Sequence, residues 1–136
     1  MAPRLLASYF QTWFLVQNRS LPARFGVVTA QNPMDRKLPA AENRRRDARL
    51  RRTLKALGLP HFRVTGGSRD GSHRERGWGV VTKSPTLIRA LAALFEQNAY
   101  FWISQDRILL GSSAGGKLRG AGTWSARQAR WPTRRA

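Results

Sequence analysis

Short apolar runs alternate with polar stretches along the chain and divide it into strands and helices. Runs rich in aromatic and β-branched residues are typical of strands, and turn residues bound them. These runs predict strands at residues 9–16, 25–31, 61–65, 78–82, 99–104 and 107–111. A short helix is the alternative over 9–16. Gln105-Asp106 joins the last two strands as a tight hairpin.

Residues 39–57 have helical rather than alternating periodicity. Leu50, Leu54 and Leu57 follow one another at i, i+4 and i+7, so they lie on one side of a helix. Gly58 then provides a common C-terminal stop for a helix. The other positions of this helix are mostly charged, so we expect its remaining faces to meet solvent.

A second helix is predicted to begin at Ser84-Pro85. Serine is a good N-cap, and proline fits the first helical position because its missing N–H would be unpaired there anyway. Leu87, Leu91 and Leu94 then share one face of this helix. Ile88 and Phe95 lie beside this face, whereas Arg89 and Glu96 point away from it.

The order of these elements predicts the fold class. After the first strand it is β-α-β-β-α-β-β, which is typical of an α+β, split βαβ (ferredoxin-like) sandwich. Such a sandwich has an antiparallel-rich sheet with two helices on one face, here with an extra N-terminal strand. Another α+β arrangement of the same elements is the alternative. We expect one domain over 1–111 and a basic Gly/Arg/Trp tail over 112–136, partly disordered or ordered on a partner.

The charge of the chain indicates the class of its partner. The 136 residues include 25 Lys+Arg and 7 Asp+Glu, which gives a formal net charge of +18. A surface of this kind attracts polyanions. We therefore expect nucleic acid, either RNA or DNA, or a nucleoprotein complex as the partner, bound mainly through phosphate contacts and without catalysis. The alternative is an interaction module or inhibitor that docks on an acidic protein surface, of a phage or host-defence type.

Basic residues gather on the first helix and in the C-terminal tail. On the helix the candidate nucleic-acid-binding residues are Arg44, Arg45, Arg49, Arg51, Arg52 and Lys55. In the tail, where arginines and an aromatic ring suit phosphates and bases, they are Arg127, Arg130, Trp131, Arg134 and Arg135. The competing interpretation is a solvated helix face and a solubilising tail.

The absence of cysteine and of a long apolar run limits the chemistry and the location. Without cysteine there is no disulfide, zinc–thiolate site or thiol nucleophile. We read no signal peptide and no membrane span, which would need about 18 consecutive apolar residues. The expected location is therefore the cytoplasm, with no membrane partner.

One glycine-rich stretch contains the residues that most resemble reactive chemistry. In residues 66–77, His73 and Glu75 would face the same side of an extended segment, and Asp70 lies just before them. These three are weak catalytic candidates, and with a metal they would make the protein an enzyme that acts on a nucleotide or nucleic acid. The competing interpretation pairs Glu75 with an arginine and packs His73 on Trp78. We predict no cofactor and no metal site.

A second group of polar residues lies at the ends of predicted strands and helices. The candidate polar pocket consists of Asn32, Asn43, Gln97 and Asn98. Asn32 ends a central strand, and Asn43 projects on the leucine line of the first helix. The competing interpretation is that these amides only satisfy buried backbone groups.

Several of these residues lie in motifs that resemble one bacterial family. The motifs are TAQNP at 29–33, EN at 42–43, GGSRDGSHRERGW at 66–78 and FEQNAYFW at 95–102. Together with Tyr9-x-x-Thr12, their order and spacing resemble the domain-of-unknown-function family 3293, in which a glycine stands at the position of Glu96. The resemblance implies a compact α+β domain and no established activity.

Overall fold

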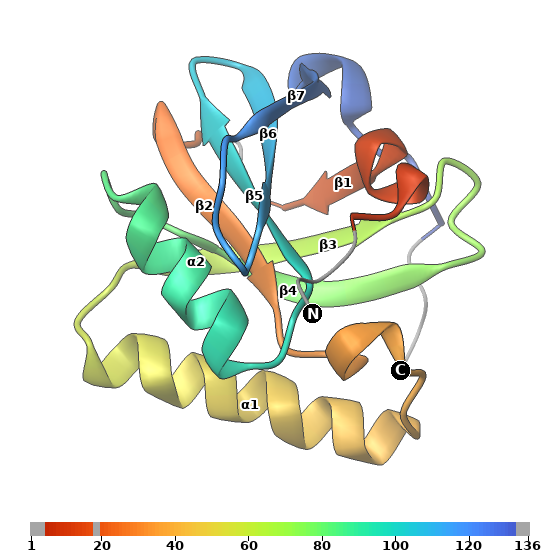
Figure 1. The fold of residues 1–136 in the computed structure, drawn as a ribbon. Coiled ribbons are helices and arrows are strands. Elements are labelled where there is room, and N and C mark those ends of the chain that lie inside the picture. Colours follow the sequence, from red (N-terminus) through yellow and green to blue (C-terminus); the bar gives the residue numbers. More distant parts are fainter. Residues whose placement is uncertain (1–4, 18–19, 133–136) are drawn as a thin grey trace.

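The computed structural model describes residues 5–17 and 20–132. Its strands are β1 (Trp13–Val16), β2 (Arg24–Thr29), β3 (His61–Gly67), β4 (Arg74–Val80), β5 (Ala99–Ser104), β6 (Arg107–Ser112) and β7 (Arg119–Thr123). Its helices are α1 (Ala40–Ala56) and α2 (Pro85–Leu94), with 3-10 turns η1 (Ala7–Gln11), η2 (Pro33–Asp35) and η3 (Ser125–Arg127). Figure 1 shows their arrangement.

All seven strands form one curled antiparallel sheet in the order β1-β3-β4-β2-β5-β6-β7. After β7 the chain returns to the opposite edge of the sheet, where Gln128 forms a parallel bridge with Phe14 of β1. The backbone N–H of Ala129 also donates to the carbonyl of Phe14 at 2.8 Å. The segment after β7 therefore ties the two edge strands together.

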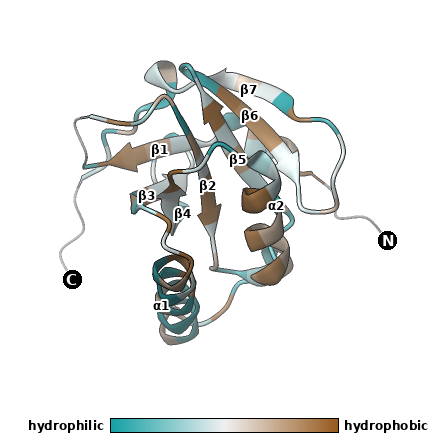
Figure 2. Cartoon of the chain, turned by 90° about the vertical axis from the view of Figure 1, so that its left-hand side faces the viewer, coloured by the Kyte–Doolittle hydropathy of each residue, from teal (hydrophilic) through white to brown (hydrophobic). Residues whose placement is uncertain are grey.

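Side chains alternate across each strand, so the sheet has a separate apolar core on each face. The outer core packs against the two helices and includes Val28, Leu50, Leu54, Trp78, Val80, Ile88, Leu91 and Trp102. The inner core fills the curl and includes Phe14, Phe25, Val27, Phe62, Val64, Ile103, Ile108, Leu110 and Trp124. Figure 2 shows that α2 is largely apolar whereas α1 is largely hydrophilic.

One glycine allows α2 to lie close to the sheet. A Cβ at Gly26 of β2 would lie 2.2 Å from Cγ1 of Ile88, which is fully buried on α2. Ser84 caps the same helix by accepting a hydrogen bond from the N–H of Leu87 at 3.2 Å. The close helix–sheet contact and the cap together fix α2 on the outer face.

The predicted α+β class is confirmed, with two helices and an antiparallel sheet. The helix expected over 39–57 is observed as α1, one residue shorter at each end, and the hairpin at Gln105-Asp106 joins β5 to β6. The largest differences in element boundaries occur at two places. Residues 7–11 form η1 rather than part of the first strand, and β3 and β4 extend into the expected glycine-rich loop until Gly67 pairs with Arg74.

The segment after Ser112 differs from the expected basic tail over its described part, residues 112–132. It adds β7 to the sheet and buries two aromatic rings in the domain. Trp124 stacks on Phe14 with ring centroids 4.8 Å apart and meets Phe25 edge-on at 5.2 Å. These rings give the segment apolar area to bury, so it packs on its own chain. Arg134 and Arg135 lie outside the described residues.

Neither helix, nor any 3-10 turn in the described part of the chain, is long and apolar enough to cross a membrane.

Trp124→Ala should destabilise the whole domain by about 3–5 kcal/mol, because it opens a cavity between the two edges of the sheet. Urea unfolding followed by circular dichroism measures this loss. Arg130→Ala, at an exposed position six residues later, is the matched control and should change stability by no more than about 0.5 kcal/mol. Equal, small effects of both substitutions would contradict the docking of this segment.

Candidate functional site

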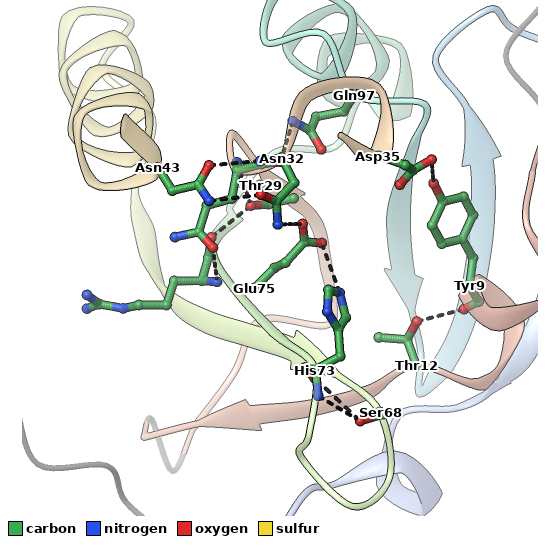
Figure 3. Close-up of polar contacts among 12 residues, drawn as sticks. Tyr9, Thr12, Thr29, Asn32, Asp35, Asn43, Ser68, His73, Glu75 and Gln97 are labelled. Carbon is green, nitrogen blue, oxygen red and sulfur yellow. Dashed lines mark hydrogen bonds and ion pairs between the residues drawn. The ribbon is translucent and has the colours of Figure 1, made fainter. Parts of the chain in front are cut away.

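An open cavity of about 1200 Å³ lies on the inner face of the curled sheet. Its floor includes apolar side chains of the inner core, among them Val27, Val64 and Phe101. Its rim is polar and comes from η1, the β2–α1 connection, the first turn of α1, the β3–β4 hairpin and the segment before β5. Figure 3 shows the polar contacts on this rim.

Asn32 is the centre of the polar contacts. It follows β2 and has a φ of 48°, in the left-handed region that asparagine tolerates better than most residues. Its Oδ1 accepts from the N–H of Leu38 at 3.0 Å and from Nδ2 of Asn43 at 2.9 Å, while its own N–H donates to Oδ1 of Asn43 at 2.9 Å. These bonds fix the orientation of its amide, and Nδ2 then donates to Oε1 of Glu75 at 2.8 Å.

Glu75 of β4 presents a partly buried carboxyl group to the cavity. Its side chain is 27% exposed, and Oε2 lies 3.9 Å from Nε2 of His73, whose side chain is 68% exposed. Burial raises the pKa of Glu75 above its usual range, and the charge of Asp35 raises it further. The hydrogen bond from Asn32 and the charge of His73 act in the opposite direction. The result is an oriented carboxyl group with a raised pKa.

A second carboxyl group lines the same cavity. Asp35, at the end of η2, accepts hydrogen bonds from the hydroxyl of Tyr9 and from Nδ2 of Asn98, the latter at 2.6 Å. Burial, followed by the contact with Asp35, raises the pKa of Tyr9 above its ordinary value. Tyr9 therefore stays a donor at physiological pH and keeps the Asp35 carboxylate in place.

Side chains at the end of β2 and after α2 form hydrogen bonds with backbone groups beneath the rim. Thr29 donates from Oγ1 to the carbonyl of Arg76 at 2.8 Å, and Gln31 accepts the N–H of Arg76 at 3.2 Å. Gln97, which is buried, donates to the carbonyls of Gln31 at 3.0 Å and Phe95 at 3.1 Å. These bonds connect β2, β4 and the end of α2 beneath the rim.

The structure brings the candidate pocket residues together with two of the candidate catalytic residues. Asn32, Asn43, Gln97, Asn98, His73 and Glu75 all line the cavity. Each amide also satisfies a backbone or side-chain group, as the competing interpretation expects. Glu75 pairs with Asn32 rather than an arginine, and His61, not His73, packs edge-on against Trp78 at 5.2 Å.

Asp70 does not share the cavity. It holds the turn of the β3–β4 hairpin by accepting from the N–H of Ser72 at 3.0 Å and from the hydroxyls of Ser68 and Ser72, each at 2.8 Å. These hydrogen bonds lower the pKa of Asp70 to about 2. Among the described residues, no group of three or more His, Asp or Glu is placed to hold a metal ion.

The basic residues of α1 divide into structural and exposed ones. Arg46 is half-buried and donates to the carbonyls of Ala30 at 2.5 Å and Phe95 at 2.6 Å. Asp47, on the inward line, forms two hydrogen bonds with Arg63 of β3, at 2.7 and 2.9 Å. The candidate binding residues Arg44, Arg45, Arg49, Arg51, Arg52 and Lys55 are all exposed. None of these six forms an ion pair with an acidic residue in the described part of the chain.

The tail candidates have mixed placements. Arg127 donates to the carbonyl of Phe10 at 3.1 Å and lines the cavity. Trp131 is buried, donates from Nε1 to the carbonyl of Arg69 at 3.0 Å, and lies under the guanidinium of Arg74. Arg130 is exposed. Arg127 and Trp131 therefore make contacts within the domain, whereas Arg130 faces solvent.

Sequence reasoning missed Asp35 as a site residue. It is a lone acidic residue after a proline turn, and its partner Tyr9 lies 26 positions earlier, so no local spacing points to the pair. Tyr9 itself was visible in the Tyr9-x-x-Thr12 motif.

Residues 28–100 match the model of a family described as "Protein of unknown function (DUF3293)". The matched residues make up more than half of the chain and include all the motifs of 29–78 and most of the last one, which confirms the resemblance seen in the sequence. Glu96, where the family pattern has a glycine, has a φ of 58° that favours glycine. No curated protein and no solved structure matches the chain.

Asn43→Ala should destabilise the domain by about 1–3 kcal/mol, because it leaves the backbone N–H of Asn32 without its partner in a partly buried position. Chemical unfolding at neutral pH measures the loss. Thr53→Ala, further along α1, is the control: its hydroxyl bonds only to the carbonyl of Arg49, four residues earlier. An Asn43→Ala protein as stable as the control would contradict the role of Asn43 in fixing Asn32.

Glu75→Gln should stabilise the protein at neutral pH, with a gain that shrinks as the pH falls. The raised pKa means that folding disfavours the carboxylate, so Glu75 reduces stability above its unfolded pKa of about 4.3. Below that pH the group is protonated in both states and the effect disappears. Urea unfolding at several pH values measures the difference between the two proteins.

Glu42→Gln, in the first turn of α1, serves as the control of opposite sign. An acidic residue there interacts favourably with the helix dipole, so its loss should cost about 0.3–1 kcal/mol at neutral pH. A Glu75→Gln protein less stable than wild type at pH 7 would contradict the conclusion that folding disfavours the charged form of Glu75.

Proposed function

Because the chain belongs to the DUF3293 family, whose function is unknown, we propose a function from its exposed surface: the protein binds nucleic acid along the outer face of α1. The observation that supports this proposal is the run of exposed cations on one helix that lack acidic partners among the described residues. Binding proceeds mainly through phosphate contacts and needs no catalysis.

The dimensions of α1 suit a nucleic-acid backbone. Its 17 residues extend over about 25 Å. Arginine offers a planar fork of donors that matches phosphate oxygens, and each neutralised phosphate releases counterions. The exposed candidates follow one another from Arg44 to Lys55, so several phosphates of one strand are within reach at the same time.

Buried contacts hold α1 rigidly, and this supports its use as a binding surface. Leu50 and Leu54 are fully buried beneath it, and the Asp47–Arg63 pair ties its middle to β3. Arg46 ties its first half to two backbone carbonyls. Because these contacts already order the helix, binding of a ligand by the outer arginines does not have to order it. The entropic cost of binding is therefore lower.

We also propose the split βαβ (ferredoxin-like) description for the core from β2 to β5. The neighbouring order β3-β4-β2-β5 with α1 and α2 as connections supports it. In this arrangement a short connection that contains η2 joins β2 to α1, and the first turn of α1 lies beside the cavity. The cytoplasm, where nucleic acid is abundant, is the compartment that the proposal implies.

The combined substitution of Arg44, Arg45, Arg49 and Arg52 by glutamine should weaken binding to a single-stranded oligonucleotide and flatten its salt dependence. Each phosphate contact on a single strand contributes about 0.7 to the slope of log K against log salt, so the slope should fall by about 3. Fluorescence anisotropy at several salt concentrations measures affinity and slope together.

The matched control replaces four exposed basic residues outside α1, namely Arg24, Arg107, Lys117 and Arg119, by glutamine. It removes the same net charge and should lose much less affinity. Equal losses in both variants would show a general charge effect and contradict the helix as the site. Retention of an acidic protein, rather than nucleic acid, after nuclease treatment would support the protein-docking alternative.

A further inference from the structure

We infer that the cavity beside α1 is a pocket for an unpaired nucleobase, whose N–H donors are bound by the carboxyl groups of Glu75 and Asp35. Binding of a base within an oligonucleotide rests on the proposed function, and it makes single-stranded nucleic acid the ligand. The pocket itself is argued from its own residues.

The cavity gathers two of the few acidic residues of the chain. The chain has 7 acidic residues against 25 basic ones, yet two of the acidic residues line this one cavity. Basic side chains line the cavity as well, namely Lys37, Arg69, Arg74 and Arg127, so the inference rests on the two carboxyl groups and not on the net charge. Carboxylate oxygens accept hydrogen bonds, and the ring N–H and amino groups of a base donate them.

The carboxyl group of Glu75 is prepared to accept further hydrogen bonds. Its Oε1 is held by the fixed amide of Asn32. Its Oε2 receives no hydrogen bond from the described residues, because Nε2 of His73 at 3.9 Å is too distant. A ligand donor at Oε2 would therefore complete the partners of a carboxyl group that the chain has already positioned.

The shape and lining of the cavity suit a planar ring. Its volume of about 1200 Å³ exceeds what one base needs and leaves room for the attached sugar. Phe101, half-buried on β5, lines the floor beside Val27 and Val64, so an aromatic ring is part of the cavity wall. Stacking on such a ring contributes to base binding whatever the identity of the base.

The position of the cavity connects it to the basic helix. Ala40 and Asn43 of the first turn of α1 line the cavity, and the exposed arginines begin at the next position, Arg44. A strand whose phosphates follow α1 therefore reaches the cavity mouth at the start of the helix. Guanine is the base we expect there, because its adjacent N1–H and N2–H₂ groups present two parallel donors to one carboxylate.

The first test uses nucleosides, which carry no phosphate. Guanosine, adenosine, cytidine and uridine are titrated up to about 1 mM, and binding is followed by NMR shifts of the backbone amides of β4 and β5. Guanosine should bind most tightly. Glu75→Gln, which keeps the shape and the bond from Asn32, should weaken it by at least about tenfold, and Asp35→Asn should also weaken it.

Two controls make the result specific. Glu96→Gln, at an exposed acidic position outside the cavity, should leave guanosine binding unchanged. The variant with glutamine at Arg44, Arg45, Arg49 and Arg52, called the α1 variant, should also bind guanosine like the wild type. A nucleoside has no phosphate for α1 to bind. No binding of any nucleoside, equal binding of all four, or a Glu75→Gln protein that binds guanosine normally would overturn the inference.

The second test distinguishes a free nucleoside from a base within a strand. Single strands that differ only in having guanine or an abasic site at one position are compared with wild-type protein, Glu75→Gln and the α1 variant. The wild type should prefer the guanine strand, and Glu75→Gln should lose that preference while retaining phosphate-dependent binding. Guanosine binding with no role for α1 in oligonucleotide binding would overturn the proposed function alone and support a site for free nucleosides.

Discussion

The hydrogen bonds of Asn32 hold together the segments on which the site depends. One asparagine amide joins the end of β2 to the connection at Leu38, to Asn43 of α1 and to Glu75 of β4. The left-handed conformation of Asn32 turns the chain between sheet and helix at this point. The same bonds therefore set where α1 begins and how the carboxyl group of Glu75 is oriented, so the basic helix and the cavity share one structural origin.

The acidic residues explain why the basic surface is left without neutralising partners. Asp47 is used to clamp α1 through Arg63, and Glu96 lies near Arg46 at 3.6 Å. Asp70 and Asp106 bind serine groups in turns, while Asp35 and Glu75 line the cavity. The seventh acidic residue, Glu42, is exposed in the first turn of α1 and forms no ion pair with a described residue. The outer arginines of α1 therefore face solvent without an acidic partner among the described residues.

Much of the fold was predictable from local pattern. The leucine spacing of α1 and the Ser84-Pro85 start of α2 are local signals, and both helices are observed at the expected positions. The strand β7 was not predictable, because its sequence RGAGT buries only Ala121 and depends on pairing with β6. For the site, His73 and Glu75 were visible through their spacing, whereas the Tyr9–Asp35 contact depends on the tertiary fold.

We propose that α1 and the adjoining cavity form one continuous surface for single-stranded nucleic acid. NMR titration of ¹⁵N-labelled protein with a short single strand would locate this surface residue by residue. The largest shifts should follow the exposed side of α1 and continue onto the cavity rim at Asn32 and Glu75. Shifts concentrated on β6 and β7, or spread evenly over all basic residues, would contradict it.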